Sequence, residues 1–469
     1  MTPSTPVTFA LYFGNRGFFP ETLIAAARQE LDAAVKHAGY GTLILDAGAT
    51  RYGAVETVAE GAVYADFLAR NRGRFAGVIL CLPNFGDETG AVAALRDAGV
   101  PILVAAYPDE LNKMGFSERR DAFCGKFSIM DVFCQYRLPF TAFTPHVVHP
   151  SSEVFQSHLH AFAAVCRVAG GMRRMTVGAV GARTTAFKTV RFDELALQRY
   201  GITTEALDLS EVIRRVRSVS TAGTAFRDKA ERLRVYTRWD GVPAEARETL
   251  ARLGVVLDEL IAEYQMDALA LRCWIELEQE LRISPCVLLS EINDRGIPAA
   301  CELDVCNAVA MHALRLASGR PATCLDWNNN YGDDPDKCIL FHCGPVPQSL
   351  MTAKGRVIDH PMFAKAMGAG CGFGCNVGRI APAPLTFASA KTEDGRLVFY
   401  LGEGAFTADP IADDFFGCAG VAQIADLQRK LLAIGRQGYR HHVSVTTGHA
   451  AEAVREAFVR YLDYTVTEL

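Results

Sequence analysis

Three polar clusters stand in or beside apolar sequence in the second half of this chain. They are CELDVCN around Glu302, CLDWNNNYGDDPD around Asp326 and RHHVSVTTGH around His442, and LFHCG places His342 between the last two. Carboxylates and imidazoles, with no set of cysteines at metal spacing beside them, suit a divalent ion that keeps open positions for a substrate. The clusters together predict a metal site, with manganese or magnesium ahead of zinc.

The stretch ACELDVCNAVAMHALRLASG, residues 300–319, resembles a buried helix that opens with two acids. A buried carboxylate is costly unless it is paired, hydrogen-bonded or bound to a metal. If a strand ends at Glu302 and a helix begins near Leu303, the Glu302 carboxylate can point into the cleft at the carboxyl end of the strand. Asp304 in the first helical turn is then favoured by the helix dipole, which predicts a functional Glu302 and a capping Asp304.

Each cluster taken alone has a simpler interpretation. A buried histidine is more often a hydrogen-bonded core residue than a metal ligand, and an Asp-Asn-Gly-Asp run is usually a turn. WNNNY at 327–331 also fits a strand followed by a turn, and CGFGC at 371–375 fits a structural glycine-rich loop. Cys301 and Cys306 are interpreted as packing residues. The metal hypothesis therefore rests on the combination of the clusters.

The elements that must position these residues follow an α/β rhythm from the start of the chain. Short apolar runs at 7–13, 41–46, 77–83 and 101–107 alternate with amphipathic stretches. This alternation predicts βαβ units and a parallel sheet. No G-x-G-x-x-G follows the first run, where the turn reads FGNRGFFPE, so we reject dinucleotide binding.

A second α/β segment begins near residue 154, with a long helix expected at 243–264 and the strand-like DALALRCW after it. Beyond residue 345 the sequence alternates and turns at Asp-Gly, which is typical of antiparallel hairpins. We predict two Rossmann-like parallel-sheet domains followed by a smaller antiparallel β domain. Their ranges are 1–153, 154–345 with the metal carboxylates, and 346–469 with a closing helix.

Composition narrows the classes of partner. The 469 residues carry a net charge of −5 without a basic cluster, which argues against nucleic acids and membranes and favours a small-molecule substrate. No segment reaches the length of a membrane-spanning apolar helix, and the N-terminus lacks a basic leader. The fourteen scattered cysteines are typical of buried free thiols in a reducing compartment. We expect a cytoplasmic protein.

The motif Glu302-x-Asp304-x-x-Asn307-x-Val-Ala-Met, with Asp326 placed 24 residues after Glu302 and Gly448-His449 following His442, resembles the L-fucose isomerase and L-arabinose isomerase superfamily. The resemblance covers the whole chain, because those enzymes have two α/β domains followed by a C-terminal β domain. It is fairly specific for the superfamily and poorly specific for the sugar.

The resemblance implies that Glu302, Asp326 and His442 bind the metal, with the two carboxylates doubling as acid and base. His342 resembles an additional histidine ligand of the arabinose branch, and Arg16 resembles a substrate-binding arginine of the fucose branch, often at a site shared between subunits. The resemblance also implies Mn²⁺ as the metal ahead of Mg²⁺, Co²⁺ or Zn²⁺, and a homo-oligomer of three or six subunits. The chain departs from the fucose branch in being shorter and in having His441 where that branch has asparagine.

Further residues are predicted to contact the sugar, because aromatic faces suit C–H surfaces and amides suit hydroxyl groups. They are Trp274, Trp327, Asn328, Asn329, Asn330, Tyr331 and His441. Arg183, in GAVGART at the end of a predicted strand, is placed to meet an anionic substituent at the far end of the sugar.

The function that follows is a metal-dependent aldose–ketose isomerase with an enediol proton-transfer mechanism. The sugar would be a 6-deoxyhexose, a pentose or a hexose with an anionic C6 group such as sulfoquinovose. Two alternatives stay open: a catalytically silent sugar-binding protein of the same fold, and an epimerase or aldolase that uses the same enediolate.

Overall fold

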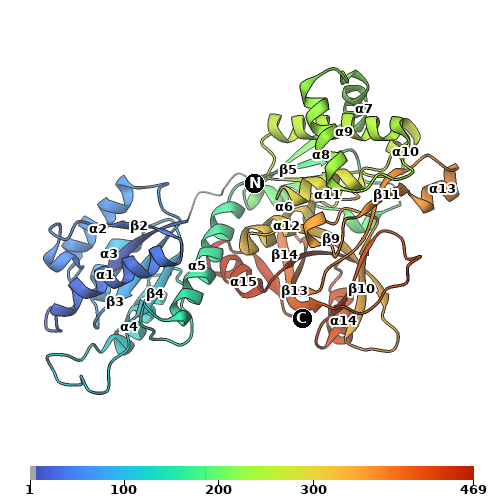
Figure 1. Cartoon of the computed structure of the whole chain (residues 1–469). Helices are drawn as coiled ribbons and strands as arrows, with labels where there is room; N and C mark the ends of the chain where they lie inside the picture. Colours follow the sequence, from blue (N-terminus) through green and yellow to red (C-terminus); the bar gives the residue numbers. More distant parts are fainter. Residues whose placement is uncertain (1–6, 185) are drawn as a thin grey trace. The chain divides into compact units, whose positions relative to one another are not determined.

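The computed structural model describes residues 7–184 and 186–469, which form two compact units (Figure 1). The N-terminal unit runs to Gly170 and includes Glu456–Asp463. The C-terminal unit runs from Gly171 to Arg455 and includes Tyr464–Leu469. Within the described part of the chain, every helix is too short or too polar to cross a membrane.

The N-terminal unit contains a four-stranded parallel sheet in the order β2-β1-β3-β4. The strands are β1 (Thr8–Phe13), β2 (Gly41–Ile44), β3 (Gly77–Leu82) and β4 (Ile102–Ala106), and the helices between and after them are α1 (Thr22–His37), α2 (Val58–Arg70), α3 (Glu88–Leu95), α4 (Ala122–Gln135) and α5 (Glu153–Met172). All six residues of β3 are buried, as expected for a parallel strand covered on both faces. The predicted parallel sheet is confirmed.

A second four-stranded parallel sheet, in the order β6-β5-β7-β8, opens the C-terminal unit. Its strands are β5 (Met175–Val180), β6 (Ile202–Leu207), β7 (Ala268–Leu271) and β8 (Ala299–Ala300), and the accompanying helices are α6 (Glu194–Arg199), α7 (Leu209–Ser218), α8 (Thr224–Tyr236), α9 (Ala244–Glu263), α10 (Glu276–Leu281) and α11 (Cys286–Asp294). The long helix expected at 243–264 is α9. Because β7 and β8 are parallel, the segments after Leu271 and Ala300 emerge at the same edge of the sheet.

The third sheet has nine strands, and six of them close into a ring. The ring order is β15-β10-β9-β16-β13-β14, and β14 pairs again with β15, with every neighbouring pair antiparallel. The ring strands are β9 (Ala322–Asn330), β10 (Lys337–His342), β13 (Ala383–Glu393), β14 (Arg396–Phe406), β15 (Cys418–Gln423) and β16 (His442–Thr447); β11 (Arg356–Asp359), β12 (Phe373–Arg379) and β17 (Thr465–Thr467) extend the sheet. The antiparallel C-terminal sheet was predicted, whereas its closure into a barrel was not.

Strands β9 and β10 precede residue 346 but belong to this barrel, so the sheet draws its strands from both sides of that predicted boundary. The division into three domains stays a prediction. Helices α13 (Pro361–Met367), α14 (Leu427–Arg436) and α15 (Ala451–Tyr461) accompany this sheet in sequence, and α15 corresponds to the expected closing helix.

The turn between β8 and α12 (Val305–Ser318) has an unusual backbone. Glu302 and Leu303 both have positive φ, 61° and 62°, a left-handed conformation that is rare for residues other than glycine. Asp304 follows as the N-cap, and its side chain accepts a hydrogen bond from the Asn307 backbone N–H at 3.1 Å. The strand, the helix start and the capping role of Asp304 agree with the sequence-based interpretation.

Candidate active site

Four segments of the C-terminal unit bring the predicted metal ligands together. Glu302 lies in the turn between β8 and α12, Asp326 on β9, His342 at the end of β10 and His442 at the start of β16. His442 Nε2 lies 2.8 Å from Glu302 Oε2 and 3.4 Å from Asp326 Oδ1. One ligand atom each of Glu302, His342 and His442 lie within 4.8 Å of one another.

The donor atoms at this point have the character of a cation site. Asp326 Oδ1, His342 Nε2 and His442 Nε2 are buried and have no hydrogen-bond partner among residues 7–184 and 186–469. Buried polar atoms are almost always hydrogen-bonded, so three unpaired atoms beside the Glu302 carboxylate indicate a place where a cation would bind. Oxygen and imidazole nitrogen atoms in this combination fit a divalent metal ion.

His442 is oriented by a buried carboxylate on its far side. Its Nδ1 lies 2.9 Å from Asp304 Oδ2, and Asp304 also accepts hydrogen bonds from Arg440 and, at 2.6 Å, from the Asn307 amide. Although burial raises the pKa of Asp304, the adjacent Arg440 guanidinium and the His442 hydrogen bond hold it well below its usual value. Asp304 therefore holds the ring through Nδ1–H and directs Nε2 at the site, where the Nε2 lone pair would be free for an ion once that nitrogen gives up its own proton.

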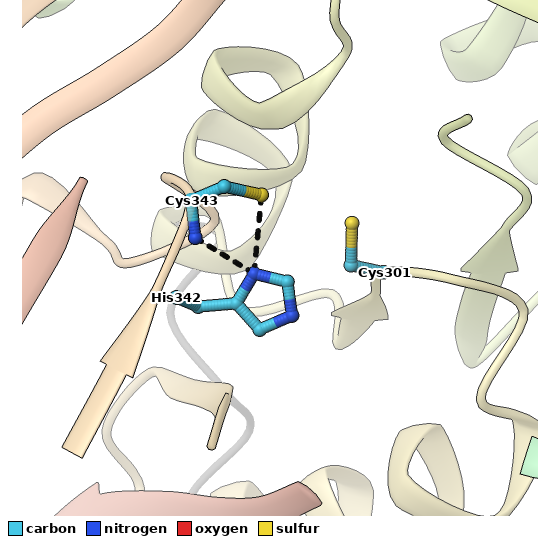
Figure 2. Close-up of side chains that lie close together, drawn as sticks. All are labelled: Cys301, His342 and Cys343. Carbon is cyan, nitrogen blue, oxygen red and sulfur yellow. Dashed lines mark hydrogen bonds between the residues drawn. The ribbon is translucent and has the colours of Figure 1, made fainter. Parts of the chain in front are cut away.

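His342 has the opposite hydrogen-bond pattern. Its Nδ1 accepts from the Cys343 backbone N–H at 2.9 Å and lies 3.2 Å from Cys343 Sγ (Figure 2). A neutral imidazole that accepts at Nδ1 carries its proton on Nε2. In this arrangement His342 presents an N–H to the site, and an ion at His342 Nε2 would require that proton to be lost and Nδ1 to stop accepting from the Cys343 backbone N–H.

Burial has opposite outcomes at the two carboxylates. At Glu302 burial raises the pKa, but the adjacent His442 imidazole outweighs it and the pKa is lowered. At Asp326 burial prevails over the nearby histidines, and the pKa is raised. A bound cation would favour the ionised form of both groups.

A cavity of about 410 Å³ opens beside these residues, within the range of small-molecule sites. It is lined by Phe187, Cys273, Trp274, Glu278, Cys286, Glu302, Asp326, Asn328, Phe341, His342, Cys343, His360, Met362, Phe363, Phe416 and His441. Its walls combine the edge of the second parallel sheet with the barrel. The carboxylates and imidazoles stand in an otherwise largely apolar surface.

Three of the predicted sugar-binding residues belong to this lining. Trp274 follows β7 and donates from Nε1 to Glu302 Oε1 at 3.1 Å. Asn328 is exposed, and His441 Nε2 lies 3.7 Å from Asp326 Oδ1. These side chains lie where a substrate bound near Glu302 would meet them.

The other predicted contacts lie elsewhere. Trp327 packs against Phe387 and donates to the Tyr400 hydroxyl at 3.1 Å. The Asn330 amide bonds the Gly332 carbonyl in the following turn. Neither residue, nor Asn329, Tyr331 or Arg183, is among the described residues that line the cavity.

Arg16 belongs to the N-terminal unit. There its Nε donates to the Gly86 carbonyl at 2.8 Å, and its guanidinium forms an ion pair with Glu88. Its predicted contact with a substrate stays a prediction.

Sequence reasoning missed a group of thiols beside the ligands. Cys301 Sγ lies 2.9 Å from Cys273 Sγ, and Cys286 Sγ lies 3.3 Å from Cys343 Sγ. Figure 2 shows Cys301 across from the His342 ring and Cys343. All fourteen cysteines are free, and Cys301 and Cys306 are fully buried as packing residues would be. Four cysteines far apart in sequence gave no spacing signal that could have revealed this cluster.

Comparison with known proteins identifies relatives of this chain. The fucose/sulfoquinovose isomerase N-terminal domain matches residues 10–173, and the L-fucose isomerase C-terminal domain matches residues 340–469. The sulfoquinovose isomerase of Priestia aryabhattai is 23% identical over 375 residues, which cover 79% of this chain and 81% of that protein. The sulfoquinovose isomerase of Clostridium sp. strain MSTE9 is 27% identical over 304 residues, or 64% and 66% of the two chains.

Among solved structures, a periplasmic solute-binding protein of an ABC transporter from Actinobacillus succinogenes with bound D-allose covers 67% of this chain and 93% of its own. Its 13% identity and TM-score of 0.19 are too low to carry an argument.

The matched domains and relatives define an aldose–ketose sugar isomerase. The chain belongs to the L-fucose isomerase superfamily.

Proposed function

We propose that this chain is a metal-dependent isomerase whose substrate is a free aldose with an anionic C6 group, of which sulfoquinovose is the type. The substrate class is supported by the printed activity of the relatives, which are sulfoquinovose isomerases. The observation that carries the metal dependence is the convergence of three orphaned buried donors, on Asp326, His342 and His442, beside the Glu302 carboxylate. Mn²⁺ is the proposed ion.

Isomerisation moves one proton between C1 and C2 and another between their oxygens. A bound divalent ion would supply Lewis-acid stabilisation of the negative charge that develops on those oxygens. Glu302, Asp326 and His442 would hold it, with His342 as a further donor. Glu302 and Asp326, both close to His442 Nε2, shuttle the protons through an enediol intermediate.

Other side chains orient the acids and the sugar. Trp274 fixes one oxygen of Glu302 through its indole N–H, which leaves the second oxygen toward His442. Asn328 and His441 supply polar contacts at the cavity wall. The apolar remainder of the wall excludes water from the reacting carbons.

The test is an assay of the Mn²⁺-loaded protein with sulfoquinovose, L-fucose, D-arabinose and L-arabinose. The readouts are ketose formation and deuterium uptake from solvent at C2, with an EDTA-treated sample and Mg²⁺, Co²⁺ and Zn²⁺ reconstitutions beside it. We expect turnover of sulfoquinovose that EDTA abolishes and Mn²⁺ restores. Turnover of a neutral sugar in preference would overturn the substrate class, and full activity in EDTA would overturn the metal dependence.

A further inference from the structure

A second polar region of the same cavity wall is built by Glu278, Ser284 and His360. Glu278 belongs to α10, Ser284 precedes α11 and His360 precedes α13. Glu278 and His360 line the cavity and are nevertheless only 1% and 3% exposed. Neither residue belongs to the proposed proton-transfer machinery.

Each of these two side chains has one buried polar atom without a hydrogen-bond partner among the described residues. Glu278 Oε1 accepts from the Ser284 hydroxyl at 2.8 Å, while Glu278 Oε2 finds no partner in the described part of the chain. His360 Nδ1 is likewise buried without a hydrogen-bond partner among the described residues. An unpaired buried polar atom destabilises the free protein, so two in one wall indicate groups that are satisfied by a ligand.

The protonation state of Glu278 suits a neutral ligand. Burial raises its pKa to about 8, so at neutral pH the carboxyl group is largely protonated. A protonated carboxyl can donate one hydrogen bond while its other oxygen accepts from Ser284. Such a group complements a hydroxyl oxygen.

The backbone behind this wall is closely packed. The Ser284 N–H donates to the Phe373 carbonyl and the His360 N–H to the Gly372 carbonyl, each at 3.0 Å. A Cβ on Gly374 would lie 1.7 Å from the Ser284 carbonyl oxygen, and one on Gly372 would lie 3.1 Å from His360 Cβ. CGFGC thus has a structural role, as the sequence suggested: its glycines let Ser284 and His360 pack closely at the start of β12.

The surroundings restrict what can bind. Phe363 and Phe416 pack on the His360 ring with centroids 4.3 and 5.6 Å away, and both line the cavity. Aromatic faces suit the C–H surface of a sugar, and isolated polar atoms between them suit individual hydroxyl groups.

We propose that Glu278 Oε2 and His360 Nδ1 form a polyol subsite that binds hydroxyl groups of the sugar beyond C1 and C2. The inference rests on the proposed function, because it takes a sugar as the occupant of this cavity. The subsite selects among sugars by the position and configuration of neutral hydroxyls, and the anionic substituent is bound elsewhere.

The experiment compares Glu278→Gln, which keeps a neutral donor, with Glu278→Leu, which has similar volume and no polar atom. With the turned-over sugar we expect KM within about threefold of wild type for Glu278→Gln and a rise of about tenfold or more for Glu278→Leu. The value of kcat should change little in either variant. Glu280→Leu, at an exposed position of the same helix, is the control and should leave KM unchanged.

Deoxy analogues of the sugar identify the hydroxyl that is bound. Removing that hydroxyl should raise KM for wild type and Glu278→Gln but add nothing to the effect of Glu278→Leu. An unchanged KM in Glu278→Leu, or additive effects for every analogue, would overturn the subsite. If Glu278→Leu fails to fold by circular dichroism, the same analogues are compared between wild type and His360→Leu: an analogue whose KM penalty disappears in His360→Leu upholds the subsite, and additive effects for every analogue overturn it.

Failure of the proposed function gives a different result. If none of the four sugars is turned over or exchanged at C2, calorimetry with their open-chain alditols tests the subsite directly. Binding to wild type and Glu278→Gln that Glu278→Leu loses would uphold the subsite without isomerase activity. No binding of any alditol to wild type would overturn it.

Discussion

His442 and Asp326 are direct partners on the neighbouring antiparallel strands β16 and β9, and their side chains meet with Nε2 3.4 Å from Oδ1. Phe341, the residue before His342, is the partner of Asp326 on its other side, in β10. The register of three adjacent barrel strands therefore sets the positions of three of the four proposed ligands. Only Glu302 comes from outside the barrel.

Glu302→Gln and Asp326→Asn should each abolish most of the activity while leaving the fold intact. An amide has nearly the same volume but cannot act as a general base, a function worth about 10²- to 10⁴-fold in rate. Steady-state kinetics and deuterium uptake at C2 check this, with circular dichroism as the test of folding. Full turnover of either variant with metal bound would contradict the assignment.

The two histidines should differ in their effect on metal binding. Asp304 orients His442 so that Nε2 faces the site, whereas the Nδ1 of His342 is engaged as an acceptor and its Nε2 carries the proton. We expect His442→Gln to lose bound Mn²⁺, and His342→Gln to retain a substantial part of it. Metal content after gel filtration measures both, and equal loss in the two variants would show that His342 changes its hydrogen bond to bind the ion.

Asp304→Asn should weaken both folding and metal binding. Asparagine still caps a helix well, so the cap itself is retained. The substitution leaves the buried Arg440 guanidinium without its charged partner, which should cost about 3–5 kcal/mol, and lowers metal affinity about 10- to 100-fold through His442. Urea unfolding and Mn²⁺ titration measure the two effects.

A matched control for that variant is Asp193→Asn at the N-cap of α6. Asp193 caps Ala196 in the same way, but its side chain is exposed. If the two substitutions lower the free energy of unfolding by the same amount, the ion pair between Asp304 and Arg440 makes no separate contribution to stability.

Removal of the metal should lower the thermal stability of the C-terminal unit. Without the ion, the buried ligand atoms of Asp326, His342 and His442 lose the partner that offsets the cost of their burial. Differential scanning calorimetry before and after EDTA, and after Mn²⁺ is restored, should show a reversible decrease in Tm. An identical Tm in all three samples would exclude a tightly bound ion.

Stability should fall as the pH drops from about 6.5 to about 4, in part because of His312. Burial lowers the pKa of His312 to about 4; nearby Asp267 opposes this shift and Arg315 adds to it. Since the unfolded chain binds the proton at a higher pH than the folded chain, each step down through this window favours unfolding. Urea unfolding at pH 4–7 should show a shallower loss for His312→Gln than for wild type, and the exposed His449→Gln should follow wild type.

The sequence predicted what is local. The helix at 243–264, the turn into α12 and the Asp304 cap each depend on residues within a few positions of one another. The acids and histidines could also be selected from the sequence as candidate ligands, because isolated charges in apolar sequence need partners. Carboxylates in apolar surroundings, such as Glu302 and Asp326, can therefore be recognised without a structure.

The features that the sequence did not predict depend on contacts between segments far apart in the chain. Asp304 and His442 are separated by 138 residues, and nothing near either of them predicts their hydrogen bond. The pairing of β14 with β15 that closes the barrel has no signature of its own. WNNNY predicts a polar face, but strand alternation and packing direct Trp327 to Tyr400 instead of the cavity.

The closed ring also restricts how this protein can diverge. Inserting or deleting one residue within β9 or β16 would turn the following side chains to the other face and carry Asp326 or His442 out of the site. In an open sheet an edge strand can shift alone, but in a ring each strand is held by two neighbours. Over evolutionary time, changes in chain length should therefore accumulate in the turns and in β11, β12 and β17, while the six ring strands vary by substitution at constant length.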